Sequence, residues 1–428
     1  MTTSEFIQQH RCSDPRQAAF LASRYPGVDM PYALDQIKGW QTARHKLPTW
    51  AAAEGIVYPH SLNMEQCSSE PAARYKAEVA QRWIQRLAAG GGAAATSMAD
   101  LTGGFGVDFS FTARCFGSAT YVERDAELCR IAAANLPHLG ISHADTVCAD
   151  AASYLAGATR HTMIFIDPAR RDTHGAKTVL IADCTPDVCA MLPTLMDKAQ
   201  FVMLKLSPML DWHKAAADLG GTVRETHIVS VGGECKELLL VLCAQGDGSG
   251  MRVICTDIQP KPGDDGTYAR SEFAYTAGDA CAPTPLLQGA PQAGCWLHEP
   301  NASVMKAGCF AQLAEAYGMR AVSANSHLLV ASRMAGAFPG RAFAIDAVTT
   351  LNKRQLHTAL AGIERANIAT RNFPMTVAEL RKRLRLKDGG DRYIFATTTA
   401  GGEHVLLLCH KPQDNGGGAP GVCDFSPK

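Results

Sequence analysis

The run Asp100-Leu101-Thr102-Gly103-Gly104-Phe105-Gly106-Val107-Asp108 decides the fold of this chain. A short apolar segment ends in Asp100 and is followed at once by glycines that allow a tight turn. Such a turn is typical of the carboxyl edge of the first strand of a parallel α/β sheet, where backbone without side chains can approach a ligand. Phe109 stands where the dinucleotide fingerprint would need a third glycine after Gly104 and Gly106. A pyrophosphate ligand is therefore disfavoured.

Short apolar runs alternate with helical segments from about residue 96 to residue 244. The runs are Met98-Asp100, Ala119-Glu123, Thr146-Ala149, Met163-Asp167 and Phe201-Leu206. Their spacing predicts parallel strands joined by right-handed crossovers. Two later runs, His227-Val231 and Leu238-Cys243, are separated by Gly232-Gly233 and a few polar residues, which predicts an antiparallel hairpin. We therefore expect an α/β fold with a Rossmann-like sheet, closed by this hairpin, over residues 93–245.

The regions on either side of this sheet have different patterns. Residues 1–92 predict a helical domain, with helices near 15–25 and 31–46 and a third that begins near Pro71, where Ser68 and Ser69 can cap it. The glycine run 90–92 ends that helix. Beyond residue 245 the pattern predicts small α+β units, with helices around 307–317 and 377–386 and strands at 393–397 and 404–409. The glycine-rich residues 412–428 predict a disordered tail.

Composition excludes several classes of protein. The chain has 428 residues, of which 46% are hydrophobic and 19% charged, so it can form a large core and is not predicted to be disordered. The 41 basic and 41 acidic residues balance, so a nucleic-acid surface would have to be local. No apolar run approaches the length of a membrane span, and we expect a cytoplasmic protein without a membrane partner.

The cysteines point to neither disulfides nor a metal. Fifteen are scattered along the chain, and the closest pair, Cys184 and Cys189, are five residues apart. Structural zinc sites and redox motifs use closer pairs. We expect buried free thiols and no metal.

Acidic residues recur at the ends of successive predicted strands. Glu123 follows Asp100 by 23 residues, where a carboxylate can accept hydrogen bonds from both ribose hydroxyls of a nucleoside. Asp150 follows the third strand, where it can meet an adenine amino group, and Asp100 lies where a carboxylate favours ammonium and sulfonium charge. The pattern predicts an S-adenosyl-L-methionine site. The predicted cofactor-binding residues are Asp100, Thr102, Gly103, Gly104, Gly106, Asp108, Glu123, Arg124, Asp150, Ala151 and Asp167. Asp108 and Arg124 could equally be a helix cap or a solvated charge.

The fourth strand leads into Asp167-Pro168-Ala169-Arg170-Arg171, beside the expected methyl donor. Asp167 could accept a hydrogen bond from an attacking NH or OH group. The stretch resembles the Asp/Asn-Pro-Pro-aromatic motif of amino-methylating nucleic-acid methyltransferases, but Ala169 and Arg170 replace the second proline and the aromatic residue. Arg170 and Arg171 could instead hold a phosphate or carboxylate, or pair with Asp172.

Lys205 and Asp211 follow the fifth predicted strand at the same edge of the sheet and are candidates for contact with the substrate. A lysine at a strand end is often simply solvated. We therefore take Asp167, Arg170 and Lys205 as catalytic candidates and Arg170, Arg171 and Asp211 as substrate-binding candidates.

Several longer stretches make the chain similar to a bacterial class I methyltransferase family that carries a carboxyl-terminal THUMP-like domain. They are Glu65-Gln66-Cys67-Ser68-Ser69-Glu70, Ala73-Arg74-Tyr75-Lys76, the loop from Asp100 to Asp108, Asp167-Pro168-Ala169-Arg170-Arg171, Glu234-Cys235-Lys236-Glu237-Leu238, the stretch from Glu299 to Gly308, and Thr370-Arg371-Asn372-Phe373-Pro374. The resemblance implies a ferredoxin-like segment at 280–332 and a THUMP-like domain at 337–411. It also implies RNA as the substrate.

A local basic surface agrees with an RNA partner. Seven basic residues lie between 371 and 392, against Glu379, Asp388 and Asp391; they are Arg371, Arg381, Lys382, Arg383, Arg385, Lys387 and Arg392. Such a surface can neutralise phosphates, although a basic helix is often only a solvated face. We expect Arg381, Lys382 and Arg383 to contact RNA.

The resulting hypothesis is methyl transfer to a base nitrogen of tRNA or rRNA by direct in-line displacement. Two alternatives remain open at this point. One is a methyltransferase that acts on a small molecule or a protein, and the other is a binding module that holds cofactor or RNA without catalysis. The sequence does not predict an oligomeric state.

Overall fold

The computed structural model describes residues 1–91, 96–170, 180–244, 250–261 and 267–412, without the side chain of Arg170. The chain divides into two compact units. The first comprises Met1–Val231, Lys236–Arg252 and Ile258–Ala269, and the second comprises Gly232–Cys235, Val253–Asp257 and Arg270–Lys428. The predicted tail lies almost entirely outside the described residues.

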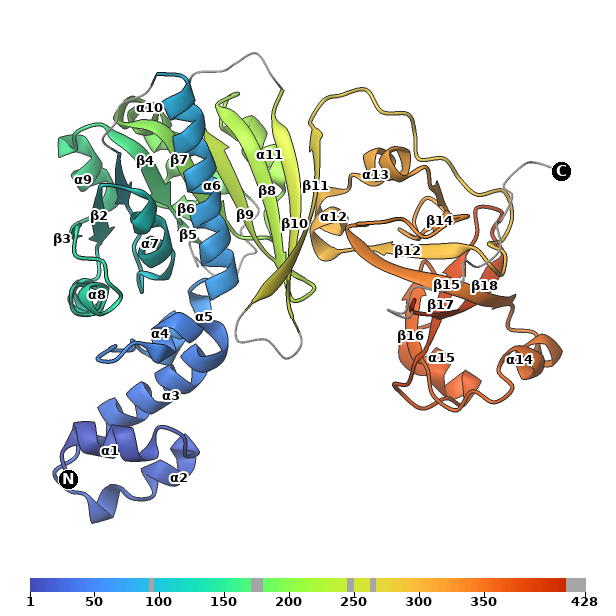
Figure 1. Cartoon of the computed structure of the whole chain (residues 1–428), viewed down its shortest axis with the longest axis horizontal. Coiled ribbons are helices and arrows are strands. Elements are labelled where there is room, and N and C mark those ends of the chain that lie inside the picture. Colours follow the sequence, from blue (N-terminus) through green and yellow to red (C-terminus); the bar gives the residue numbers. More distant parts are fainter. Residues whose placement is uncertain (92–95, 171–179, 245–249, 262–266, 413–428) are drawn as a thin grey trace. The chain divides into compact units, whose positions relative to one another are not determined.

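The amino-terminal part of the first unit is helical, as the sequence predicts (Figure 1). Its elements are α1 (Thr3–His10), α2 (Pro15–Ala19), η1 (Ala22–Arg24), α3 (Met30–Lys46), α4 (Pro48–Ala52), α5 (Ser61–Gln66) and α6 (Glu70–Ala89). Prolines occupy the first turns of α2, α3, α4 and α6, where the missing N–H costs nothing. Ser69 is the N-cap of α6, but neither it nor Ser68 caps the helix with its side chain. The predicted capping was wrong in this respect, because the Ser68 hydroxyl donates instead to Asp108, at 2.7 Å.

The sheet that carries the site is mixed. Its strands are β1 (Ser97–Asp100), β2 (Ser118–Glu123), β3 (Ala144–Cys148), β4 (His161–Ile166), β7 (Ala199–Leu206), β8 (Val223–Val231), β9 (Glu234–Leu242), β10 (Arg252–Pro260) and β11 (Tyr268–Thr276). The strand order is β11-β10-β8-β9-β7-β4-β1-β2-β3. Strands β1, β2, β3, β4 and β7 pair in parallel, whereas β9 pairs antiparallel with β7. The prediction of a parallel sheet closed by an antiparallel hairpin is confirmed.

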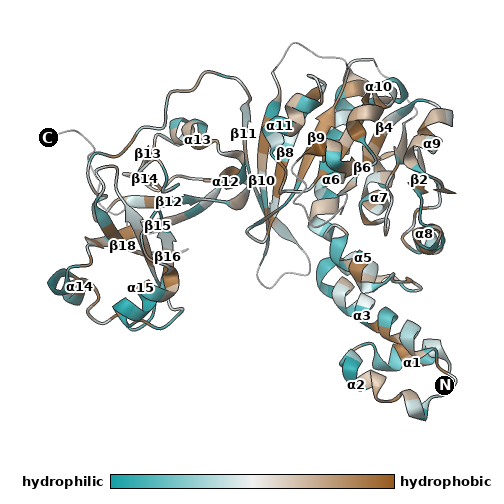
Figure 2. Ribbon diagram, turned by 180° about the vertical axis from the view of Figure 1, so that it is seen from behind, coloured by the Kyte–Doolittle hydropathy of each residue, from teal (hydrophilic) through white to brown (hydrophobic). Residues whose placement is uncertain are grey.

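Helices lie on this sheet and bury its apolar side chains (Figure 1). They are α7 (Val107–Thr112), η2 (Ala113–Cys115), α8 (Ala126–His138), α9 (Ala151–Gly157), η3 (Ile181–Asp183), α10 (Val188–Lys198) and α11 (Trp212–Asp218); a short ribbon of β5 (Ala169–Arg170) and β6 (Cys184–Thr185) lies between them in sequence. Helix α6 packs on α7 and β8, α8 on β2 and β3, and α10 on β4 and β7. Figure 2 shows that the central strands are hydrophobic, which agrees with burial on both faces.

A hydrogen-bonded cluster fixes α6 to strand β8. The Glu225 carboxylate accepts from Trp83 Nε1 at 2.8 Å, from Arg86 at 3.1 Å and from His227 Nε2 at 3.2 Å. The Tyr75 hydroxyl lies 2.8 Å from the other ring nitrogen of His227. Burial opposes ionisation of Glu225, but His227, Trp83 and Arg86 together lower its pKa to about 2. The ionised carboxylate therefore stabilises the position of α6.

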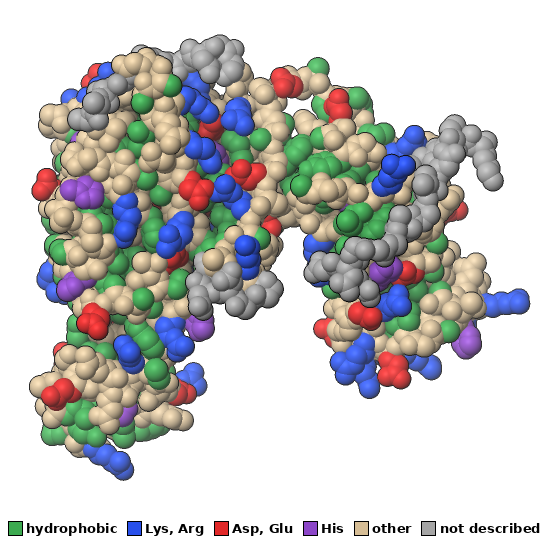
Figure 3. Space-filling model, viewed as in Figure 1, with side chains coloured by type: hydrophobic (Ala, Val, Ile, Leu, Met, Phe, Trp, Pro, Cys, Tyr) green, Lys and Arg blue, Asp and Glu red, His purple; other side chains and the backbone are tan. Residues whose placement is uncertain are grey.

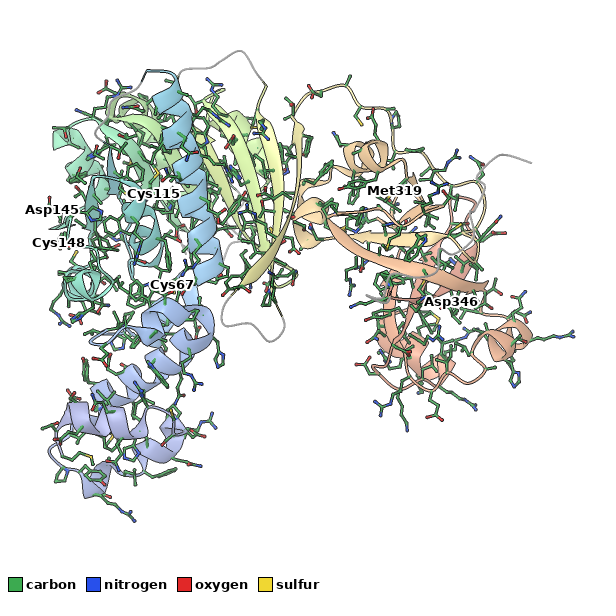
Figure 4. The ribbon with its side chains drawn as sticks, in the orientation of Figure 1. Cys67, Cys115, Asp145, Cys148, Met319 and Asp346 are labelled. Atoms are coloured by element: carbon green, nitrogen blue, oxygen red, sulfur yellow. The ribbon has the colours of Figure 1, made fainter. Side chains whose placement is uncertain are left out.

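The second unit is built on a seven-stranded sheet in the order β13-β14-β12-β15-β18-β17-β16. Its strands are β12 (Trp296–Pro300), β13 (Arg320–Ala321), β14 (Leu329–Ala331), β15 (Gly340–Thr349), β16 (Asn367–Arg371), β17 (Arg392–Thr398) and β18 (His404–His410), and its helices are α12 (Ala302–Ala307), α13 (Phe310–Tyr317), α14 (Lys353–Ala359) and α15 (Val377–Leu384). Two apolar clusters fill it, one around Phe343 and Phe395 and one between α15 and the sheet around Leu380 and Leu406. Asp346 of β15, labelled in Figure 4, pairs with Arg392 and His410.

Two further expectations concern the whole chain. The cysteines of the described residues form no disulfide, but Cys12 and Cys148 are exposed and five others are partly exposed, so the predicted burial was wrong for these seven. Within the described residues, no helix is both long and apolar enough to cross a membrane.

Glu225→Gln tests the attachment of α6. Loss of the ionised carboxylate leaves buried donors without their charged acceptor, so the free energy of unfolding near pH 7 should fall by about 3 kcal/mol. Because the folded-state pKa is lowered from 4.5 to about 2, the stabilisation is complete above pH 4.5 and is lost as the pH falls through 2. Urea unfolding at several pH values should therefore show wild type and variant converging in acid. Glu127→Gln, at an exposed ion pair, is the control and should change little; an equal loss in both variants would contradict this role of Glu225.

Candidate active site

The glycine loop after β1 is held by the two neighbouring strands. Leu101 N donates to Phe165 O at 3.0 Å and Gly103 N to Val122 O at 2.9 Å. Gly104 and Gly106 adopt φ values of 54° and 87°, which disfavour other residues. A Cβ on Gly103 would lie 2.1 Å from the buried Tyr121 ring. The loop therefore needs glycine at position 103 for packing and at 104 and 106 for backbone conformation.

Glu123 at the end of β2 closes this loop. Its Oε2 accepts from Gly104 N at 2.9 Å, while Oε1 accepts from Arg124 N at 2.9 Å and from Asp125 N at 3.0 Å. A carboxylate oxygen has two acceptor positions, so the side chain can still accept hydrogen bonds from a ligand. Glu123 thus lies against the loop with which the sequence predicted it to act.

Three other predicted cofactor residues, Arg124, Asp150 and Ala151, lie shortly after the ends of β2 and β3. Asp150 is exposed and caps α9, with Oδ1 accepting from Ser153 N at 2.8 Å, and this hydrogen bond lowers its pKa. Ala151 is the buried first residue of that helix, and the side chain of Arg124 is exposed. The structure thus gives the exposed Asp150 side chain a capping role, and its contact with adenine stays a prediction.

Asp100 and Thr102 join the loop to the chemical site. Asp100 is 1% exposed and accepts from Thr102 N at 3.0 Å. Burial raises its pKa well above the usual value, and the carboxylates of Asp108, Asp167 and Glu123 raise it further. Thr102 Oγ1 accepts from Asp167 N at 2.6 Å, so the turn after β1 positions the backbone after β4.

Four charged residues in or directly after β1, β4, β7 and β9 project to one face of the sheet; they are Asp100, Asp167, Lys205 and Glu237. The residue two positions away from each of them, on the same strand, belongs to the apolar cluster under α6. These four residues are Met98, Phe165, Met203 and Leu239. Side chains two residues apart lie on the same face. The side chains that continue this face are Asp100, Asp167, Lys205 and Glu237. The register of β4 on β7 ends at Ile166 and Leu204, so Asp167 and Lys205 come next, side by side.

The charged groups on this face form a chain of ion pairs. Lys76 of α6 is fully buried, and its Nζ lies 2.6 and 2.7 Å from the two oxygens of Glu237 and 3.1 Å from Asp108 Oδ1. Lys205 Nζ lies 3.7 Å from Asp108 Oδ2 and donates a short hydrogen bond to Asp167. The order Glu237, Lys76, Asp108, Lys205, Asp167 runs from the interior to the surface, where Asp167 is 37% exposed.

These contacts set the charge states of two members. Burial opposes the charge on Lys205, but Asp167, Asp108 and Glu237 raise its pKa, so it stays an ammonium ion. Burial likewise opposes ionisation of Asp108, but Lys76 and Lys205 lower its pKa. Lys205 is therefore a hydrogen-bond donor at neutral pH and not a base.

Sequence reasoning missed Lys76, Glu237 and Ser68 as site residues. All three lie in stretches on which the family resemblance was based, but each is far in sequence from the loop. A signal was present: Lys76 lies on the apolar face of α6 with Tyr75, Val79 and Trp83, where a lysine needs a buried partner. Ser68 also brings the segment before α6 against Asp108, and burial raises the pKa of the neighbouring Cys67 thiol (Figure 4).

The remaining candidates lie elsewhere or are not described. Asp211 is 61% exposed and caps α11 through His213 N and Lys214 N. Arg171 lies outside the described residues, and only the backbone of Arg170 is described, in β5. Arg381 donates to Ala366 O and pairs with Asp388, whereas Lys382 and Arg383 are exposed. In the described parts of the chain, no group of three or more metal-ligating side chains is present.

Comparisons with known proteins agree with this architecture. Residues 340–411 match a family model described as THUMP domain-like, and residues 296–339 match a ferredoxin-like domain. A protein of Mycobacterium tuberculosis named as an uncharacterised S-adenosylmethionine-dependent methyltransferase is 26% identical over 298 residues, which cover 68% of this chain and 75% of the relative. A crystal structure from Porphyromonas gingivalis W83, assigned as a methyltransferase, is 27% identical with a TM-score of 0.80 and covers 96% of this chain and 98% of its own.

The sheet order, the glycine loop and these similarities lead to one assignment. The solved structure extends over both units, so the likeness includes the carboxyl-terminal domains as well as the sheet. The chain carries a ferredoxin-like segment and a THUMP-like domain at its carboxyl end, and over most of its length it is similar to S-adenosylmethionine-dependent methyltransferases.

Proposed function

We propose that this enzyme transfers a methyl group from S-adenosyl-L-methionine to RNA. The observation that carries the proposal is the Lys205–Asp167 pair, which lies at the carboxyl edge of the sheet and is joined to the glycine loop through Thr102. Methyl transfer needs an aligned nucleophile and exclusion of water rather than a strong acid or metal. A fixed, partly exposed carboxylate next to the cofactor loop is suited to align that nucleophile.

The charge of the site fits a cationic cofactor. Asp100, Asp108, Glu123, Asp167 and Glu237 bring five carboxyl groups around two ammonium groups, those of Lys76 and Lys205. A ligand with an ammonium and a sulfonium group would favour ionisation of the buried Asp100 carboxyl group, whose pKa burial and the neighbouring carboxylates raise. We assign the methionine part to Asp100 and the loop glycines, the ribose to Glu123, and the adenine to the region of Asp150 and Ala151. When bound, the cofactor supplies an activated methyl group.

RNA is supported by the second unit. The THUMP-like match covers the basic region predicted from sequence. Arg371, Arg381 and Arg392 pair with Glu299, Asp388 and Asp346, so their charge is partly offset. Four basic side chains on and after α15 are exposed: Lys382, Arg383, Arg385 and Lys387. Figure 3 shows Lys and Arg side chains, with acidic side chains among them, in the part of this unit that holds α14 and α15. Such a surface can neutralise several phosphates.

Gly103→Ala tests the cofactor loop. The added Cβ would overlap the Tyr121 ring and displace the loop, so affinity for S-adenosylhomocysteine in calorimetry should fall at least about tenfold, or 1.4 kcal/mol. Gly157→Ala is the matched control, because no atom lies within 4 Å of its added Cβ. Unchanged affinity in Gly103→Ala would remove the loop from the cofactor site.

Asp167→Asn tests the chemical role. Incubation with radiolabelled cofactor and total RNA from cells that lack the gene should label RNA with the wild-type enzyme. The variant keeps the shape of the side chain but loses the charge that pairs with Lys205, so labelling should fall at least about 100-fold, far more than cofactor affinity falls. Transfer by the wild type to small metabolites or proteins but not to RNA would contradict the proposal.

A triple variant, Lys382→Gln, Arg383→Gln and Arg385→Gln, tests the basic surface. RNA affinity in filter binding should fall, and the slope of log affinity against log salt should decrease by roughly 0.7 to 0.9 for each phosphate that the variant no longer neutralises. Lys353→Gln with Arg354→Gln changes two exposed charges on α14 and serves as the control. An equal fall in affinity in both variants would indicate only a general effect of charge.

A further inference from the structure

We propose that the methyl acceptor is a hydroxyl oxygen of RNA ribose, the 2′-hydroxyl, and not a base nitrogen. The inference rests on the proposed RNA substrate and names the atom within it. It departs from the base nitrogen that Asp167-Pro168 suggested in the sequence, and it is carried by the paired ammonium and carboxylate groups at the reacting edge of the sheet.

The acceptor position is defined by Lys205 and Asp167 together. Asp167 directly follows β4, Lys205 lies on the adjacent parallel strand β7 one residue after the last pair of their register, and the two side chains are joined by a hydrogen bond. Asp167 is 37% exposed and Lys205 is 13% exposed. A single ligand group can therefore contact the carboxylate and the ammonium group together, because both are partly exposed and they are in direct contact.

The buried members of the chain of ion pairs, Glu237, Lys76 and Asp108, hold Lys205 next to Asp167. Asp108 lies between the two lysines, at 3.1 Å from Lys76 and 3.7 Å from Lys205. Glu237 binds Lys76 with both oxygens, and Ser68 donates to Asp108. Buried ion pairs hold their members in defined positions because every alternative arrangement leaves a charge without a partner. Lys76, Glu237 and Ser68 are thus positioning residues, and Lys205 and Asp167 are catalytic residues.

A hydroxyl group can form one hydrogen bond with the carboxylate of Asp167 and one with the ammonium group of Lys205. Its hydrogen can be donated to Asp167, while one of its two oxygen lone pairs accepts from Lys205. The second lone pair stays free to attack the methyl carbon in line. An ammonium ion has three N–H donors, so Lys205 can hold Asp167 and still donate to the acceptor oxygen.

A base nitrogen matches the pair less well. An amino nitrogen of a base has a single, delocalised lone pair and two N–H donors, so it cannot accept from Lys205 and attack carbon at the same time. Amino-methylating enzymes with the Asp/Asn-Pro-Pro-aromatic motif also stack the base on the aromatic residue. Here Ala169 and Arg170 follow Pro168, and no aromatic side chain occupies that position.

The transfer step balances with these groups alone. The ribose oxygen forms a bond to the methyl carbon as the carbon–sulfur bond breaks, and both electrons of that bond stay on sulfur. The hydroxyl proton passes to the Asp167 carboxylate and then to solvent. Lys205 keeps its protons throughout, because its carboxylate neighbours raise its pKa. A ribose hydroxyl is also the group that distinguishes RNA from DNA.

The product itself provides the test. Total RNA from cells that lack the gene is incubated with the full-length enzyme and radiolabelled cofactor, and the labelled RNA is divided. One half is digested to nucleosides for mass spectrometry, and the other is hydrolysed in alkali. We expect the label on the ribose fragment of a nucleoside and in alkali-resistant dinucleotides, because a 2′-O-methyl group blocks cleavage at the next phosphate.

The possible outcomes separate this inference from the proposed function. Label in a base, with complete alkaline hydrolysis to labelled mononucleotides, would overturn the ribose acceptor and leave RNA methylation standing. No label in RNA at all would overturn the proposed function as well. This comparison uses the wild-type enzyme and does not depend on the folding of a variant.

Lys205→Met tests the ammonium group directly. Removal of one donor aimed at a reacting oxygen lowers kcat by about 100-fold or more in other enzymes, and we expect a loss of that size with unchanged cofactor affinity. Lys214→Met, on α11 and 49% exposed, is the control and should keep full activity. A folded Lys205→Met enzyme that retains wild-type kcat would overturn the role given to Lys205.

Discussion

The buried ammonium group of Lys76 is the constraint on which the site depends. A lysine without exposed surface needs anionic partners, and Lys76 has Glu237 and Asp108. These partners come from β9 and α7, so one charge joins the helix before the sheet, the helix after the glycine loop and the antiparallel strand of the hairpin. Desolvation of these ions costs several kcal/mol, and only the completed arrangement recovers it. The ion chain therefore forms correctly only when the whole unit has folded.

The contacts between α6 and β8 support this arrangement. Trp83 and Tyr75 bind the Glu225–His227 pair on β8, while Lys76 binds Glu237 on β9. The helix is thus fixed to two strands, by Tyr75 and Lys76 near its start and by Trp83 about two turns later. Motion of α6 along its axis would break both sets of contacts, so the position of Asp108, and through it that of Lys205, is coupled to the packing of the helical region.

The two ends of the chemical site have different electrostatic tasks. Around the glycine loop, carboxylates exceed cations, which favours a positively charged cofactor. At the surface end, Lys205 and Asp167 would present one donor and one acceptor to the proposed substrate. The basic side chains of the second unit can bind the phosphates of a long substrate, but they do not select the reacting atom. In the proposed function, affinity for RNA and the chemical step would therefore reside in separate parts of the chain.

The sequence by itself determined the sheet, because alternation of apolar runs and helices, the glycine loop and the Gly232-Gly233 hairpin are local patterns. It also indicated Asp100, Glu123, Asp167 and Lys205, since strand ends are visible in sequence. The sequence analysis missed strands β10 and β11 and most of the strands of the second unit, because their residues do not alternate regularly between apolar and polar. Only the tertiary structure joined Lys76 and Glu237, which are 161 residues apart, to the site. Such an ion pair leaves little trace in sequence, because each charge is explained only by a partner that folding brings to it.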